Sequence, residues 1–249
     1  MTETTPESRT ALITGGNSAL AVAIAESLVG DQATSWRIWL GTRSNRERAE
    51  GFAAVHSGYV TLVDLDVTNG AAWEAAVSRI LETDGSLDAL INNAGFHRDS
   101  LLATMTDDDW KAVIDSNLSG AFLGCRAVIP GMMNQRYGRI VNIASLSALL
   151  APKGQTNYAA AKAGLLAMSQ SLAKETARAG ITVNCVCPGY IDTPALDSID
   201  PEQRKALARE IPMRRFGKPA EVASAVRFLA CPDASYITGS VLKIDGGIL

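Results

Sequence analysis

The stretch that decides the fold is Thr10-Ala11-Leu12-Ile13-Thr14-Gly15-Gly16-Asn17-Ser18-Ala19-Leu20-Ala21. Residues 10–14 form a short apolar run that predicts a buried strand, and the alanine-rich stretch 18–30 predicts a helix. The two glycines between them favour a tight turn. A helix that starts at such a turn points its N-terminus at the turn, which is how many proteins hold the phosphates of a dinucleotide. Because the spacing is not GxGxxG, this segment alone fits an ordinary strand-to-helix turn equally well.

The same alternation of strand and helix continues along the whole chain. Apolar runs that predict strands lie at residues 10–14, 36–42, 59–65, 87–91, 138–144, 181–187 and 240–244. Segments with helical spacing lie at residues 18–30, 45–56, 69–83, 107–136, 156–179 and 219–231, with a short helix at 201–210. Strands that alternate with helices form parallel sheets joined by right-handed crossovers. We therefore predict an α/β fold of Rossmann type: a doubly wound, seven-stranded parallel sheet with helices on both faces. It forms one domain over residues 9–249, after a disordered tail at 1–8.

The composition narrows the class of protein. The 249 residues are 47% hydrophobic and 20% charged, and their formal net charge is −3, which argues against a nucleic-acid-binding protein. The four cysteines contain no CxxC pair and the chain has two histidines, so we expect no metal site and free thiols in a reducing compartment. The N-terminus does not read as a signal peptide, and no uninterrupted apolar run reaches the roughly 18 residues of a membrane span. We expect a cytoplasmic protein that binds no membrane.

Two long segments follow predicted strands, at residues 94–106 and 188–218. Ligands of open α/β sheets bind where the chain leaves the carboxyl ends of the strands, so both segments are candidate site loops, and the proline-rich 188–218 is the candidate lid. Arg43 stands at the tip of the second strand, where an NAD site usually has an acidic residue. A guanidinium there fits the 2′-phosphate of NADP, so the sequence favours NADP, and the alternative is a solvated basic helix start.

Three further residues suggest catalysis. Ser145 closes the fifth predicted strand, and Tyr158 and Lys162 follow at positions i and i+4 of a helix, so they share one face. A cationic amine beside a phenol lowers the pKa of the phenol, which makes a tyrosine usable as a general acid or base. Each residue taken singly is more often structural, and their joint spacing is what points to a site.

Taken in chain order, these residues resemble the short-chain dehydrogenase/reductase family from about residue 9 to 247. The matching motifs are the turn at 14–21, Asp66-Val67, Asn92-Asn93-Ala94-Gly95, Asn117, Ser145, Tyr158 with Lys162, and Pro188-Gly189. Residues 154–158, 180–184, 236–239 and 245–247 look like those of bacterial 3-oxoacyl-acyl-carrier-protein reductases and acetoacetyl-CoA reductases. The resemblance implies NADPH-dependent reduction of a 3-oxoacyl thioester, linked to acyl carrier protein or CoA, to its 3-hydroxyacyl form, in fatty-acid-type or polyketide-like biosynthesis.

The resemblance also implies roles for single residues. Tyr158 would donate a proton to the substrate carbonyl, Ser145 would orient that carbonyl, and Lys162 would bind the nicotinamide ribose. Asn117 would anchor the water of a proton relay behind Lys162. The residues implied to hold NADPH are Gly15, Asn17, Ser18, Leu20, Arg43, Asp66, Val67, Asn93, Ala94, Gly95, Tyr158, Lys162, Pro188, Gly189, Ile191 and Thr193.

Two positions depart from the pattern of the family. Ala19 and Ala21 stand where its turn usually has glycines. A non-glycine residue forced into a left-handed conformation costs about 1–2 kcal/mol, so we expect NADPH binding to survive but to weaken. Reductases of this type dock the acyl carrier through basic residues beside the cleft. Arg136 matches one such position, and Arg178 adjoins Ala179, which occupies the other.

Two other functions stay open on the sequence alone. One is a reductase or dehydrogenase of a different ketone or alcohol, because the two candidate loops do not reveal the shape of the pocket. The other is a non-catalytic partner subunit, which the altered glycine turn would explain. The resemblance further implies a homotetramer, with one interface along the helices at 107–136 and 156–179 and the other at the C-terminal strand and tail.

Overall fold

Within residues 7–196 and 200–249, the part of the chain that the computed structural model describes, seven parallel strands form one sheet in the order β3-β2-β1-β4-β5-β6-β7. The chain runs outward from β1 to β3, crosses back to β4 on the other side of β1, and continues to β7. This is the predicted doubly wound topology. The strands are β1 (Glu7–Thr14), β2 (Thr34–Thr42), β3 (Val60–Asp64), β4 (Ala89–Asn92), β5 (Gly138–Ile143), β6 (Ile181–Pro188) and β7 (Val241–Ile244).

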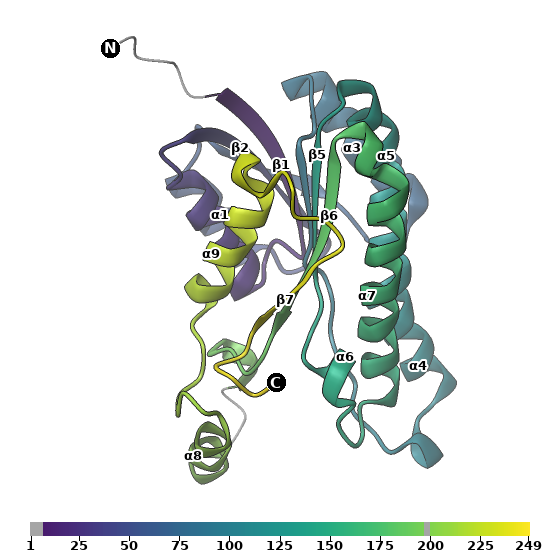
Figure 1. The fold of residues 1–249 in the computed structure, drawn as a ribbon, viewed down its shortest axis with the longest axis vertical. Helices are drawn as coiled ribbons and strands as arrows, with labels where there is room; N and C mark the ends of the chain where they lie inside the picture. The colour runs from purple at the N-terminus through teal and green to yellow at the C-terminus, as the bar shows by residue number, and fades with distance from the viewer. Residues whose placement is uncertain (1–6, 197–199) are drawn as a thin grey trace.

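Helices cover both faces of the sheet (Figure 1). One face carries α1 (Ala19–Val29), α2 (Glu47–Val55) and α9 (Pro219–Ala230), and the other carries α3 (Gly70–Asp84), α5 (Gly120–Gln135) and α7 (Thr156–Thr176). The shorter helices are α4 (Asp107–Ile114), α6 (Ser147–Leu150) and α8 (Pro201–Glu210). Single turns lie at Leu102–Thr104, Ala177–Ala179, Pro194–Leu196 and Pro232–Ala234.

The central strands are buried on both faces, which is why they read as unbroken apolar runs in the sequence. On one face, Ile24 and Leu28 of α1 pack in the same cluster as Val226 of α9. On the other face, Trp73 of α3 and Met132 of α5 share a second cluster. Cys185 and Cys187 lie in a third cluster, both buried on one side of β6, as their spacing in a strand predicts.

The sequence located all seven strands, and no strand end in the structure differs from the predicted one by more than three residues. One boundary was wrong: β1 begins at Glu7 and pairs with β2 from there, so residues 7 and 8 belong to the sheet and not to a tail. Residues 1–6 of that tail, and 197–199 of the candidate lid, lie outside the described residues.

The predicted helix 107–136 is one continuous helical stretch with a π-helical turn, Asp115–Ser119, between α4 and α5. Such turns insert one extra residue per turn and often mark functional sites. By length and composition Asp107–Gln135 could also cross a membrane. However, Val128 and Met132 are buried against the sheet, so the apolar side of α5 has a partner inside the fold.

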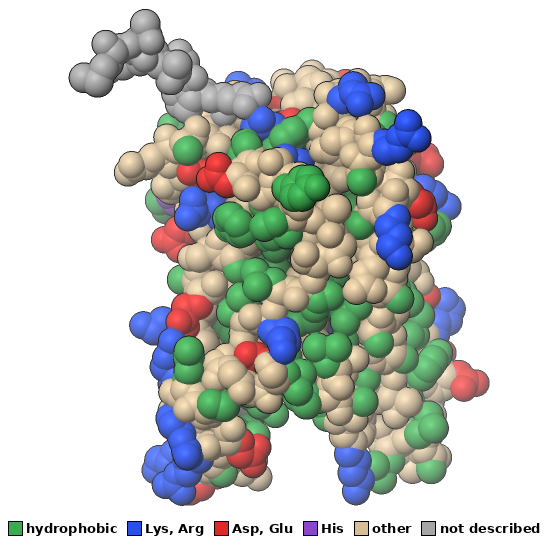
Figure 2. All heavy atoms as spheres, in the orientation of Figure 1, with side chains coloured by type: hydrophobic (Ala, Val, Ile, Leu, Met, Phe, Trp, Pro, Cys, Tyr) green, Lys and Arg blue, Asp and Glu red, His purple; other side chains and the backbone are tan. Residues whose placement is uncertain are grey.

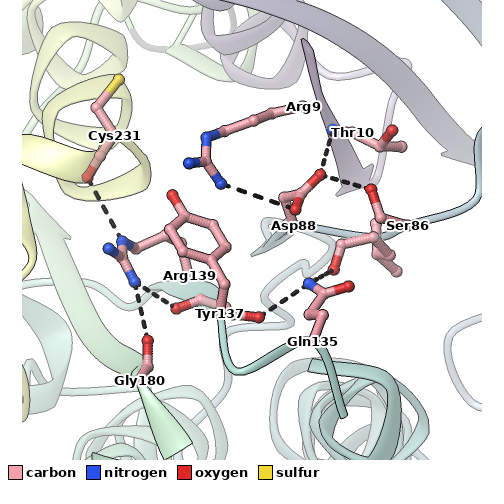
Figure 3. Close-up of polar contacts among 11 residues, drawn as sticks. Arg9, Thr10, Ser86, Asp88, Gln135, Tyr137, Arg139, Gly180 and Cys231 are labelled. Atoms are coloured by element: carbon pink, nitrogen blue, oxygen red, sulfur yellow. Dashed lines mark hydrogen bonds and ion pairs between the residues drawn. The ribbon is translucent and has the colours of Figure 1, made fainter. Parts of the chain in front are cut away.

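A polar cluster closes the amino-terminal edge of the sheet (Figure 3). Asp88 accepts hydrogen bonds from the Thr10 backbone NH at 2.8 Å and from the Ser86 hydroxyl at 2.9 Å, and its carboxylate lies 3.8 Å from the Arg9 guanidinium. The ring of Tyr137 lies against two guanidinium groups, those of Arg9 and Arg139. The Arg139 guanidinium also donates to the Gly180 carbonyl at 3.2 Å. This cluster joins β1, β4, β5 and β6 at the edge opposite their carboxyl ends.

We expect Asp88→Ala to lower the free energy of unfolding by about 3 kcal/mol, because it leaves the buried Thr10 amide unpaired and removes a carboxylate beside a buried arginine. Urea unfolding followed by circular dichroism measures the change. Glu82→Ala, an exposed acid near the end of α3, is the control and should change stability by less than about 0.5 kcal/mol. Equal effects of the two substitutions would contradict a structural role for the cluster.

Candidate active site

Two adjoining hollows open at the carboxyl edge of the sheet, beside the point where β1 and β4 diverge. The first has a volume of about 420 Å³ and the second about 450 Å³. Ala94 lines the first and its neighbour Gly95 the second, so the two meet at the end of β4. In the space-filling view the lower end of the molecule is hollowed between the α8 side and the α6–α7 side (Figure 2). Open α/β sheets bind their ligands at this place.

The structure brings most of the predicted site residues together in these hollows. The first is lined by Gly15, Arg43, Asp66, Val67 and Ala94. The second is lined by Ser18, Leu20, Asn93, Gly95, Ser145, Tyr158, Lys162, Pro188, Gly189, Ile191 and Thr193. Asn17 and Asn117 line neither.

Hydrogen bonds from the end of β4 hold the glycine turn. Gly15 has φ +65°, and a Cβ there would lie 2.9 Å from the Ala94 Cα, so the turn and the close approach both require glycine. The Asn93 side-chain amide donates to the Thr14 carbonyl at 2.9 Å and to the Ser18 hydroxyl at 3.0 Å. Ser18 in turn caps α1 by accepting from the Ala21 backbone NH. The helix N-terminus therefore points into the hollow in a fixed position.

The strain that we expected at Ala19 and Ala21 is absent, and this prediction was wrong. Both residues belong to the first turn of α1, and neither has a positive φ. Ala21 is fully buried among the residues between α1 and the sheet, where its methyl group contributes to packing. Ala19 lines the second hollow, so its methyl group lies where a cofactor would pass, whereas that of Ala21 does not.

Asn17 does not line either hollow, and its side chain instead holds two parts of the fold together. Its side-chain carbonyl accepts from the backbone NH groups of Arg48 and Ala49, which fixes the start of α2 against the turn. Arg48 lines the second hollow and donates from its guanidinium to the Asn17 carbonyl at 2.8 Å. The sequence analysis missed Arg48. Its place five residues after Arg43, in a run of arginines, was the available signal.

Arg43 lies at the rim of the first hollow with its guanidinium 3.5 Å from the Asp66 carboxylate. Burial tends to raise the pKa of Asp66, but hydrogen bonds from Thr68 and the charge of Arg43 outweigh it and hold this pKa below its ordinary value. Asp66 is therefore an anion at neutral pH. The Arg43 side chain is 67% exposed, so its cation remains available to a ligand.

Ser145, Tyr158 and Lys162 converge in the second hollow. Ser145 follows the end of β5, while Tyr158 and Lys162 lie one helical turn apart near the start of α7. The Ser145 hydroxyl donates to the Ser147 hydroxyl at 3.2 Å, and Ser145 and Tyr158 line the same hollow. The Lys162 amine is buried, donates to the Ile143 carbonyl at 2.8 Å, and lies 5.6 Å from the centre of the Tyr158 ring.

Burial dominates the ionisation of this group. It raises the pKa of Tyr158, with Asp99 and Cys187 acting in the same direction and the hydrogen bond to Ser145 opposing them. We expected Lys162 to lower the pKa of Tyr158, and that prediction was wrong for the protein without ligands. Burial also lowers the pKa of Lys162 to about 8. At neutral pH the tyrosine therefore keeps its proton and the lysine is mostly charged, so Tyr158 can act as a proton donor.

Asn117 lies in the π-helical turn, behind Lys162. Its side-chain amide donates to the carbonyls of Phe96 and Val113 at 2.8 and 2.9 Å. Its Oδ1 is buried and has no hydrogen-bond partner among the described residues. A small hollow between the turn and α7 is lined by Asn117 and Lys162 together. The hollow is too narrow to hold a water molecule as the side chains stand, so the structure gives no place for the predicted relay water beside Asn117.

Arg136 and Arg178 do not lie beside this cleft, so that expectation was wrong for a single chain. Arg136 ends α5 directly before β5, and Arg178 directly precedes β6, which places both at the amino-terminal edge of the sheet. The Arg136 guanidinium donates to the Arg178 carbonyl at 3.1 Å. Ser145 and Pro188, at the other ends of the same strands, border the hollows.

The residues present fit a nicotinamide dinucleotide. The capped N-terminus of α1 faces the space beside Gly15, where a side chain would clash, and the hollows on either side of Ala94 provide room for its two halves. No cluster of three or more histidine, cysteine or acidic side chains in the described parts of the chain is placed to hold a metal ion. Fold and site together define a nicotinamide-dependent oxidoreductase.

Comparison with known proteins identifies the family. A family model described as enoyl-(acyl carrier protein) reductase matches residues 15–249. The chain is 42% identical to the 3-oxoacyl-acyl-carrier-protein reductase FabG of Vibrio harveyi over 246 residues, which covers 97% of this chain and 98% of that protein. It is 40% identical to FabG of Escherichia coli (97% and 98% covered) and 38% identical to FabG of Chlamydia muridarum (96% and 97% covered). The chain belongs to the short-chain dehydrogenase/reductase family.

The burial of Lys162 has a measurable effect on stability. Because its pKa falls from 10.5 in the unfolded chain to about 8, the unfolded state binds more protons between these pH values, and stability rises with pH across that window. We expect the free energy of unfolding of the wild type, minus that of Lys162→Met, to increase by about 1 kcal/mol between pH 7 and pH 9. Urea unfolding of both proteins at the two pH values measures this difference. Lys174→Met, an exposed position on the same helix, should show no such change, and a pH-independent difference for Lys162→Met would contradict the assignment.

Proposed function

We propose that this protein is a cytoplasmic, NADPH-dependent reductase that converts a 3-oxoacyl thioester to the 3-hydroxyacyl form, in fatty-acid-type biosynthesis. The observation that carries the proposal is the convergence of Ser145, Tyr158 and Lys162 in one hollow beside the capped turn after β1. The similarity to FabG proteins over nearly the whole chain supports the substrate class. A hydroxyl, a protonated phenol and a buried cation around one point fit a carbonyl oxygen that gains a proton.

NADPH, when bound, supplies the hydride to the carbonyl carbon. The Ser145 hydroxyl donates a hydrogen bond to the carbonyl oxygen and orients it. Tyr158 gives its phenolic proton to that oxygen, which completes the alcohol. The Lys162 cation stabilises the phenolate that Tyr158 then becomes, and it binds the ribose hydroxyls. Asn117 offers its unpaired Oδ1 as an acceptor behind Lys162, and it would anchor a relay water only if the narrow hollow between them widens.

The cofactor residues divide according to the two hollows. Gly15, Ser18 and Leu20 would hold the pyrophosphate at the N-terminus of α1, with Asn17 fixing the turn from behind. Asp66 and Val67 would line the adenine, and Asn93, Ala94 and Gly95 the adenosine side. Pro188, Gly189, Ile191 and Thr193 would border the nicotinamide side. Arg43 would bind the 2′-phosphate, and Arg48 adds a second cation near the turn.

The alternative of a non-catalytic subunit loses its motive, because the alanines of the turn cause no backbone strain. A second alternative is that the substrate is another ketone or alcohol. The chemistry would then be the same, and the two substrate classes would differ only in how they fit the candidate lid at 188–218 and the loop at 94–106. A screen of 3-oxoacyl thioesters against simple ketones separates the two. Turnover of ketones without turnover of thioesters would overturn the proposed substrate class.

We propose that the enzyme assembles as a homotetramer, with α5 and α7 in one interface and β7 with the C-terminal tail in the other. Phe122 and Met133 on α5 are 46% and 48% exposed, and a hollow of about 420 Å³ between α5 and α7 is lined by Phe122, Ile129 and Met168. An exposed apolar surface of this kind is usual for a face that is covered in an assembly.

For the cofactor, we expect fluorescence titration to give tighter binding of NADPH than of NADH. Arg43→Ala should weaken NADPH binding about tenfold, because charged hydrogen bonds to the 2′-phosphate are lost, and should leave NADH binding unchanged. Arg37→Ala, an exposed arginine of the same strand that pairs with Asp84, is the control. An equal loss for both cofactors in Arg43→Ala would contradict its role at the 2′-phosphate.

For the carrier, we expect Arg178→Glu to lower kcat/KM for a carrier-linked substrate about tenfold and to leave that for the CoA thioester unchanged. Arg178 is the better test because Arg136 also closes α5 with a left-handed conformation, φ +52°. Arg79→Glu, an exposed arginine on α3, is the control. Steady-state kinetics with both substrates measures whether only the carrier-linked reaction is slowed. An unchanged rate on the carrier-linked substrate would place the docking surface elsewhere.

A further inference from the structure

Arg48 is the second residue of α2, and its side chain borders the second hollow at the end where α1 begins. The other lining residues at this end are Ser18, Ala19 and Leu20. The N-terminus of a helix carries a partial positive charge and exposes backbone NH groups, so anions bind there. Arg48 therefore places a full positive charge next to a position that already favours an anion.

Two hydrogen bonds to one residue of the turn hold Arg48 in this position. The backbone NH of Arg48 donates to Oδ1 of Asn17 at 2.9 Å, and its Nη1 donates to the backbone carbonyl of Asn17 at 2.8 Å. The first bond uses only the main chain of Arg48, so it survives a change of the side chain. The second bond holds the guanidinium against the turn.

The Arg48 guanidinium has unused donors and an unpaired charge. An arginine side chain carries several N–H donors, and the bond to the turn uses only one of them. The neighbouring arginines each pair with an aspartate, Arg43 with Asp66 and Arg46 with Asp64. Within the part of the chain that the structure describes, Arg48 has no carboxylate at ion-pair distance. Its charge is therefore available to a ligand in the second hollow.

Ser18 and the first turn of α1 provide further donors at the same end of the hollow. The Ser18 hydroxyl oxygen accepts from the Asn93 side chain at 3.0 Å and from the Ala21 backbone NH at 3.0 Å. These two bonds occupy its lone pairs, which leaves the hydroxyl hydrogen to be donated. The backbone NH groups of Ala19 and Leu20 have no acceptor among the described residues. An anion with several oxygens is the ligand that matches this set of donors.

The charges that line the two hollows indicate which anion this is. The first hollow is lined by two arginines, Arg43 among them, and by two aspartates. The second is lined by Arg48 and Lys162, and no acidic side chain of the described residues lines it. The pyrophosphate is the anionic group that joins the two halves of a dinucleotide, whereas the 2′-phosphate lies on the adenosine half. The position of Arg48, at the beginning of α1, is that of the pyrophosphate.

Resting on the proposed function, in which a nicotinamide dinucleotide binds here, we propose that Arg48 binds the pyrophosphate of the cofactor. The Ser18 hydroxyl and the first NH groups of α1 complete the set of donors to it. NADPH and NADH share the pyrophosphate, so Arg48 contributes affinity for both and no preference between them. The preference comes from Arg43 at the 2′-phosphate. The planar fork of a guanidinium suits two phosphate oxygens at once.

Two fragments of the cofactor separate the two phosphate positions. ADP-ribose contains the pyrophosphate and no 2′-phosphate, whereas 2′-AMP contains the 2′-phosphate and no pyrophosphate. We expect Arg48→Gln to weaken the binding of ADP-ribose about tenfold, because charged hydrogen bonds are lost, and to leave the binding of 2′-AMP unchanged. Arg43→Ala should have the reverse effect. Isothermal titration calorimetry measures all four changes, and Arg37→Gln, an exposed arginine that pairs with Asp84, is the control.

The whole dinucleotides give a second measurement. Arg48→Gln should weaken the binding of NADPH and of NADH by the same factor. The double variant with Arg43→Ala and Arg48→Gln should weaken the binding of NADPH by the product of the two single losses, because the side chains contact different groups. Arg48→Lys, which keeps the charge and removes the fork, should recover part of the affinity for ADP-ribose.

The outcomes test the role of Arg48 and the proposed function separately. Unchanged binding of ADP-ribose in Arg48→Gln, or a loss confined to 2′-AMP and NADPH, would overturn the role of Arg48. An equal loss for both fragments would mean that the substitution distorts the turn, and it would also overturn that role. A wild type that binds NADPH but reduces no 3-oxoacyl thioester would overturn the proposed function and leave the role of Arg48 standing. A wild type that binds neither NADPH nor ADP-ribose would overturn both.

Discussion

The reversal of strand order beside β1 is the constraint on which the rest of the structure depends. The helix after β1 packs on one face of the sheet, whereas the helical stretch that follows β4 packs on the other, so the two connections separate at the carboxyl ends of neighbouring strands. The two hollows open between them. The Asn93 side chain bridges that gap by bonding to Thr14 and Ser18, so that the opening keeps a fixed shape. The backbone NH groups of Asn93 and Ala94 also donate to the Thr14 hydroxyl, so the end of β4 and the glycine turn are held together by several bonds.

The chemistry of the site then follows from how little water reaches it. A phenol and an amine in contact with solvent would keep ordinary proton affinities, and burial shifts both in the direction of their neutral forms. For Tyr158 the neutral form is the one that can give a proton. For Lys162 the shift to about 8 leaves most molecules charged at neutral pH, so the cation persists at a cost in stability. The hydrogen bond to the Ile143 carbonyl gives that cation a partner inside the protein. Stability lost at Lys162 and reactivity available at Tyr158 have the same physical origin.

The sequence predicts those features that depend on local pattern and fails where the outcome depends on distant packing. Apolar runs locate the strands because parallel strands are buried on both faces, and the spacing of Tyr158 and Lys162 on one helix locates the centre of the site. The pattern of a turn does not reveal its dihedral angles, so the alanines at 19 and 21 looked strained although both are ordinary helical residues. The effect of Lys162 on Tyr158 was misjudged because charge pairs can be read from a sequence but burial cannot.

The positions of Arg136 and Arg178 link the proposed docking of the acyl carrier to the proposed oligomer. Both lie at the amino-terminal edge of the sheet, separated from the hollows by the full length of β5 and β6. A carrier protein docked on these arginines therefore cannot deliver its acyl group to the hollow of the same chain from beside it. Docking there becomes productive only if a neighbouring subunit presents its own hollow next to that edge. In that case the oligomer is part of the active site, and a dissociated subunit would retain activity on a small CoA thioester while losing its advantage on the carrier-linked substrate.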